Sequence, residues 1–113
     1  KFERRLRRID PTLTSFAYSA STYDATIVAA LGAVAAESTD GVDIAERLRE
    51  ISGGSGDGEK CTSFRECKAL LEQHRPIDYD GLTGGIAFDA KNDETETTYV
   101  LHVFGKDGTY SVK

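Results

Sequence analysis

Residues 79–104 read YDGLTGGIAFDAKNDETETTYVLHVF, and this stretch decides the fold of the chain. Within it, apolar residues stop recurring at helical spacing and begin to alternate, at Ile86 and Phe88 and again from Tyr99 to Phe104. Alternation with a period of two is typical of strands. We therefore expect a strand pair within 86–104, turns at 90–93 and 105–108, and a short third strand at 110–112.

Upstream of this stretch the hydrophobic pattern is helical, because apolar side chains recur every three or four residues. Asp10-Pro11 ends the first helical segment, and Ser38-Thr39-Asp40 caps the third. A capping box formed by Ser63 and Glu66 begins the last one. We expect the end of a helix at 1–9 and three further helices at 21–37, 40–51 and 63–74. The predicted fold of this chain is α+β, with three helices packed on a small, mostly antiparallel sheet.

The composition is that of an ordinary globular domain, with 39% hydrophobic and 29% charged residues. A net charge of -5 argues against binding to a phosphate backbone, so we expect no nucleic-acid partner. One basic cluster, which we interpret as a solvated helix face, consists of Arg4, Arg5, Arg7 and Arg8. No apolar run approaches the roughly 20 residues that a membrane span needs.

The 113 residues fit one domain. The chain begins at Lys1 and contains no methionine, so we expect it to be one piece of a longer protein. The Gly-rich segment 52–58 lacks the Lys-Ser/Thr pair of a phosphate-binding loop, and we interpret it as a plain connection.

The two cysteines, Cys61 and Cys67, lie six positions apart. On one continuous helix their Cα atoms would be about 9 Å apart, too far for a disulfide. The capping box starts the helix at Ser63, so Cys61 lies on the incoming segment and can fold back beside Cys67. We expect a Cys61–Cys67 disulfide and an oxidising compartment. The alternative is a buried Cys67 unrelated to Cys61. Two cysteines without a nearby histidine pair do not predict a metal site.

Catalytic residues are sparse, since the only histidines are His74 and His102. A thiol nucleophile at Cys67 with either histidine is a weak alternative, and we expect no enzyme activity. Two acidic clusters offer carboxylates for Ca²⁺, but their order does not fit an EF-hand loop, and solvated turns explain them better. These clusters are Asp78 with Asp80, and Asp93 and Glu94 with Glu96.

Two motifs taken together resemble a known family. The stretch 79–104, set beside Ser21-Thr22-Tyr23-Asp24-Ala25 at the start of a small-residue helix, is similar to the C-terminal part of the branched-chain amino acid and amide binding proteins. These are solute receptors of ABC-type importers, and the resemblance runs from Phe2 to Val112. The family usually has Gly where Asn92 stands, and Asn is the best substitute at a left-handed position.

The resemblance implies a parent with the two-lobed α/β fold of type I periplasmic binding proteins. The parent would be a non-catalytic extracytoplasmic receptor without a cofactor. It would bind a small amino acid or amide and deliver it to a membrane permease. The location would be the periplasm or the cell surface, with lipid anchoring through an upstream segment as one way to hold it there. The alternative is a ligand-sensing domain of the same fold in a signalling receptor.

On the family's pattern, residues 1–78 form the mainly helical part of one lobe, 79–85 a hinge crossover, and 86–113 strands of the other lobe. The ligand-binding candidates are Tyr18, Ser21 and Tyr23, near the start of the central helix. Tyr23 is equally well explained as a core residue. The main polar anchors of the family lie upstream, so we expect this chain alone to bind solute poorly. We also expect it to self-associate, with strand exchange through the 81–85 connection.

Overall fold

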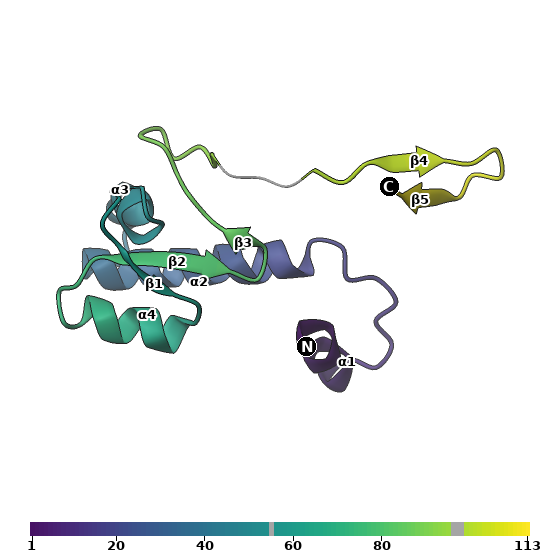
Figure 1. Ribbon diagram of the computed structural model, residues 1–113. Coiled ribbons are helices and arrows are strands. Elements are labelled where there is room, and N and C mark those ends of the chain that lie inside the picture. Colours follow the sequence, from purple (N-terminus) through teal and green to yellow (C-terminus); the bar gives the residue numbers. More distant parts are fainter. Residues whose placement is uncertain (55, 96–98) are drawn as a thin grey trace.

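The computed structural model describes residues 1–54, 56–95 and 99–113 (Figure 1). They form a small α+β domain with four helices and small mixed sheets. The helices are α1 (Phe2–Ile9), α2 (Ser19–Ala36), α3 (Gly41–Ile51) and α4 (Phe64–Leu71). The strands are β1 (Glu59–Cys61), β2 (Ile77–Gly81), β3 (Gly84–Gly85), β4 (His102–Phe104) and β5 (Tyr110–Val112).

The core lies where α2, α3 and α4 meet the parallel pair β1–β2 (Figure 1). We call these three helices and two strands together the body. In the register of this pair Glu59 faces Ile77 and Cys61 faces Tyr79. The buried side chains of the core come from α2, the end of α3, β1, α4, β2 and the segment after β3. They are Val28, Leu31, Ile51, Cys61, Cys67, Leu70, Ile77, Tyr79 and Ile86. The body is therefore held together by contacts between segments that are far apart in the sequence.

Local sequence explains how the helices of the body begin and meet. The Asp40 side chain accepts a hydrogen bond from the Val42 amide and so caps α3. Where α2 meets α3, a Cβ added at Gly32 would lie 2.9 Å from Cγ2 of Ile44. Glycine at this position therefore lets the two helices approach closely. The cap predicted within Ser38-Thr39-Asp40 is present, and Asp40 provides it.

Several predicted elements differ from the structure. Residues 77–81 form strand β2, where the sequence pattern predicted no strand. Residues 86–88 form no strand, and Phe88 makes a single antiparallel bridge with Glu94. The last predicted helix, 63–74, is shorter because α4 ends at Leu71 and His74 has a left-handed φ of 56°. The single mostly antiparallel sheet is replaced by a mixed sheet, β1-β2-β3, and a separate hairpin.

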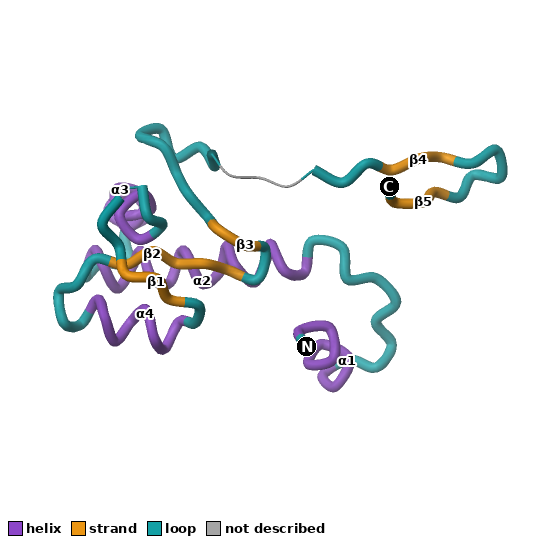
Figure 2. The backbone as a smooth tube through the Cα atoms, viewed as in Figure 1, coloured by secondary structure: helices purple, strands orange, loops and turns teal. Residues whose placement is uncertain are grey.

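The separate hairpin consists of β4 and β5, which pair antiparallel, with Val103 facing Ser111 (Figure 2). The predicted strand at 99–104 is thus shortened to three residues, and Thr98, which would have preceded it, lies outside the described residues, as does Glu96. Figure 1 places the hairpin well away from the body. The radius of gyration is 16.6 Å, against about 13 Å for a compact domain of this length, so the chain is extended.

Helix α1 lies near the start of α2 (Figure 1). The rings of Phe2 and Tyr23 pack with centroids 5.3 Å apart, and the Arg7 guanidinium lies 4.7 Å from the centroid of Phe16. Among the described helices, no single one is long and apolar enough to cross a membrane, but α2 and α3 together, bent by 103°, have the length and composition of a broken span.

Candidate functional site

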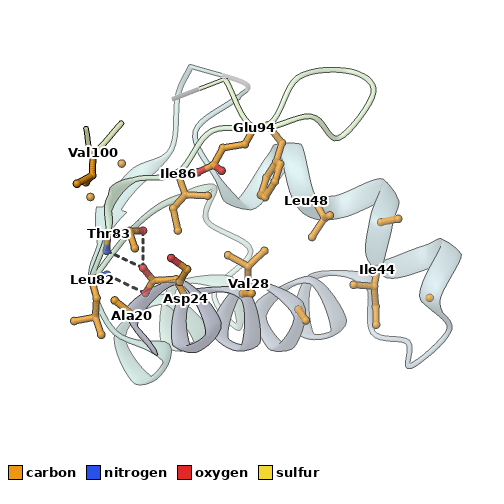
Figure 3. A pocket seen from close by; sticks show the side chains of 18 residues that line it. Ala20, Asp24, Val28, Ile44, Leu48, Leu82, Thr83, Ile86, Glu94 and Val100 are labelled. Carbon is orange, nitrogen blue, oxygen red and sulfur yellow. Dashed lines mark hydrogen bonds between the residues drawn. The ribbon is translucent and has the colours of Figure 1, made fainter. Parts of the chain in front are cut away.

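The carboxylate of Asp24 joins helix α2 to the turn between β2 and β3 (Figure 3). It accepts hydrogen bonds from the amides of Leu82 (2.9 Å) and Thr83 (2.8 Å), and from the Thr83 hydroxyl (2.7 Å). The Tyr79 hydroxyl donates a fourth bond of 3.1 Å. Asp24 is only 2% exposed, yet its two oxygens are fully used. A buried carboxylate with this many donors fixes the turn firmly on the helix. We call this group the Asp24 latch.

Glycine makes room for the latch. A Cβ added at Gly81 would lie 2.5 Å from Cγ of Asp24, so a side chain there would displace the carboxylate. Gly84 has a φ of +113°, a conformation that other residues rarely adopt. The Gly-Leu-Thr-Gly order of the turn therefore has a physical reason, because it brings two backbone amides and one hydroxyl to a single buried acid.

Tyr79 is the aromatic member of the latch and is 1% exposed. Burial raises the pKa of its hydroxyl, and the nearby negative charge of Asp24 raises it further. The hydroxyl therefore stays protonated well into the alkaline range and keeps donating to the carboxylate. This bond connects the core strand β2 directly to α2.

An open groove of about 960 Å³ lies beside the latch. Helix α2 forms its floor, and α3 and the segment after β2 form its walls, with Leu82 and Val100 at one end and Ile44 at the other (Figure 3). Its lining is mostly small or apolar. The lining residues are Ala20, Ser21, Asp24, Ala25, Val28, Ala29, Gly41, Ile44, Ala45, Leu48, Leu82, Thr83, Gly84, Gly85, Ile86, Phe88, Glu94 and Val100.

The three predicted binding residues lie in three different places. Ser21 is exposed and lines the groove next to the latch. Tyr18, at the start of α2, is 83% exposed and has a left-handed φ of 61°. Tyr23 lies outside the groove, in the smaller hollow between α1 and α2, where its ring packs on Phe2. Of the three, the structure thus brings only Ser21 to the groove, and Tyr23 packs against α1 rather than in the core cluster.

Sequence reasoning missed the central member of this site. It placed Asp24 in the first turn of α2 as a helix-start residue and gave no role to Thr83. The signal was nevertheless present, because an acid on the inner face of an apolar helix needs several donors. The Gly-rich turn some 58 residues later supplies them.

The structure has the predicted disulfide, with the Cα atoms of Cys61 and Cys67 5.4 Å apart. The Ser63 side chain accepts from the Glu66 amide, as the capping box predicts, while the Glu66 carboxylate accepts from the Thr62 amide rather than that of Ser63. Both cysteines are buried in the core. The disulfide leaves no thiol for a nucleophile at Cys67.

The acidic clusters have local explanations. Lys60 forms ion pairs with Asp78 (2.8 Å) and Asp80 (3.0 Å), which places its ammonium between both carboxylates of the first cluster. In the second region, Asp89 accepts from the amides of Lys91 and Asp93 and so organises the turn. Among residues 1–54, 56–95 and 99–113, no group of three or more His, Cys, Asp or Glu side chains is placed to share a metal ion.

Comparison with known proteins found no family model that matches the chain, and no similar curated protein or solved structure.

Proposed function

We propose that this chain is part of a two-lobed receptor that binds a small amino acid or amide outside the cytoplasm and delivers it to an ABC-type importer. The Asp24 latch is the observation that carries the proposal. It joins the two motifs on which the family resemblance rests, because Asp24 belongs to the first motif and Leu82 and Thr83 to the second. A resemblance built on two distant motifs gains weight when they form one buried cluster.

The arrangement around the latch suits such a ligand. The first turn of α2 has no side-chain cap, and its positive end favours a carboxylate. Ser21 offers a hydroxyl there, and the apolar groove suits an aliphatic side chain. Tyr18 presents an exposed ring at the same helix end, where a second lobe could close on it. In this proposal the latch sets the position of these groups and does not itself contact the solute.

Binding should need the second lobe. We expect calorimetry with leucine, valine or a neutral amide to give no heat with the 113-residue chain at millimolar ligand. The protein of full natural length should show a ligand-dependent rise in melting temperature. Tyr18→Ala should weaken this binding about tenfold or more, since an aromatic ring contributes about 150–250 Å² of contact. Ile9→Ala is the matched control, because Ile9 is also 83% exposed.

Two results would contradict the proposal. One is a full-length protein whose melting temperature responds to no neutral amino acid or amide. The other is an equal loss of affinity in the Tyr18→Ala and Ile9→Ala variants. Micromolar binding by the 113-residue chain would show instead that the complete site lies within it.

A further inference from the structure

The β4–β5 hairpin is an unusual surface for a folded chain, because every side chain of both strands is exposed. Its apolar residues include Phe104 at 74%, and Tyr110 and Val112 at 61% each. Just before it, Tyr99 is 90% and Leu101 61% exposed. Phe104 faces Tyr110 in the hairpin register, and their ring centroids lie 6.0 Å apart, so the two form one exposed apolar face. An exposed apolar face marks an interaction site. A two-stranded hairpin alone is only marginally stable in water, so a partner surface would also stabilise its fold.

The same chain carries a second apolar surface. The groove between α2 and α3 is open, and of its two acidic residues Asp24 is already fully hydrogen-bonded. Its floor includes Ala25 and Ala29, both exposed and too small to fill it. Such a floor leaves room for the aromatic and branched side chains of the hairpin.

These two surfaces are neighbours. Val100 lines one end of the groove, and β4 begins two residues later and runs away from the body (Figure 1). A two-fold axis near Val100 would therefore place the hairpin of a second copy on the groove of the first, and make the same contact again in reverse. We propose that two copies of this chain form such a reciprocal dimer.

The available area is sufficient. The exposed parts of Phe104 and Tyr110, which face each other in the hairpin register, amount to on the order of 270 Å², taking roughly 150–250 Å² for each whole ring. Each docking covers a similar area of groove and occurs twice, so the total is about 1,100 Å², just above the roughly 1,000 Å² that a specific interface needs.

The structure also suggests a different segment for the exchange between two copies. The sequence suggested exchange through residues 81–85, but the latch holds Leu82 and Thr83, and Ile86 is 6% exposed in the core. Exchange at that turn would take a buried carboxylate away from its donors within the chain, so we place the exchange elsewhere. The part that is exchanged lies after Ile86.

Light scattering coupled to size exclusion tests the proposal on the 113-residue chain. We expect a mass of twice 12.3 kDa in the micromolar range. Phe104→Asp in the hairpin and Ala29→Asp in the groove should each give the monomer mass. Val42→Asp should remain dimeric, because Val42 is 67% exposed on α3 but does not line the groove. Far-UV circular dichroism should be unchanged in all three variants, since each position is exposed.

Mixing the variants separates this dimer from other pairings. Phe104→Asp has an intact groove and Ala29→Asp an intact hairpin, so their equimolar mixture should recover one of the two contacts and show a mass above the monomer. A dimeric Ala29→Asp beside a monomeric Phe104→Asp would mean that hairpins pair with each other, and would overturn groove docking. A monomeric unmodified chain, or a dimer that survives both substitutions, would also overturn it.

Discussion

The body and the hairpin of this chain differ in burial and in how far apart in the sequence their contacting residues lie. In the body, Leu31, Ile51 and Ile77 are 0% exposed, and segments more than fifty residues apart meet at the Asp24 latch. In the hairpin, contacts are between residues of two adjacent strands, such as the facing rings of Phe104 and Tyr110, whose centroids lie 6.0 Å apart. The comparison teaches that strand-forming sequence alone does not create a core. Apolar alternation gives a hairpin, but burial requires a second surface.

The largest expected effect comes from equal truncations in the two regions. Leu31→Ala should lower the free energy of unfolding by about 2–5 kcal/mol, because it opens a cavity in the core. Leu101→Ala, at a side chain 61% exposed, should change it by less than about 0.5 kcal/mol. Urea unfolding of the two variants measures the difference. Equal losses would mean that the hairpin is part of the same cooperative unit as the core.

A somewhat smaller effect is expected from the latch. In Asp24→Asn, the side-chain NH₂ group would replace one carboxylate oxygen and face backbone N–H groups that now donate hydrogen bonds to that oxygen. Since hydrogen bonds to a charged group contribute about 1.5–3 kcal/mol each, we expect a loss of about 2–3 kcal/mol in unfolding free energy. Amide hydrogen exchange should show faster exchange at Leu82 and Thr83.

Thr83→Val provides the matched control for this latch prediction. It removes only the hydroxyl bond to Asp24 and keeps the Thr83 amide bond, so it should cost about 1 kcal/mol. If Asp24→Asn proved as stable as the unmodified protein, the latch would not hold the body together.

The smallest expected effect is the loss of stability at alkaline pH that comes from the Tyr79 hydroxyl. Its pKa is raised in the folded state above the ordinary value of 10.0. The protonated form is therefore favoured by folding, so this contribution to stability is complete below about pH 10 and is lost as the pH rises further. Tyr79→Phe should cost about 1 kcal/mol near neutral pH and reduce the alkaline fall. Thermal unfolding from pH 8 to 11 measures both.

Tyr110→Phe is the control for this pH series, because Tyr110 is 61% exposed on the hairpin. Its profile should follow that of the unmodified protein. If the Tyr79→Phe profile did the same, the alkaline loss would come from other groups.

The sequence by itself determined the local structure of this protein. The cap at Asp40, the Ser63 capping box and the turn before Tyr110 each act within a few residues, so their patterns predicted real features. The disulfide belongs with them, because Cys61 and Cys67 are brought together by a single helix start.

Only the tertiary structure decided the strands and the site. Residues 77–81 alternate Ile77 and Tyr79 with acids, yet they became a buried strand only because β1 lies alongside and Lys60 pairs with those acids. Residues 86–88 alternate equally well, but among the described residues they pair only through the single bridge from Phe88 to Glu94. Asp24 acquired its role from donors 58 and 59 residues away. Strand pairing and the burial of a charge both depend on a partner distant in sequence, and a local pattern carries no information about where that partner will lie.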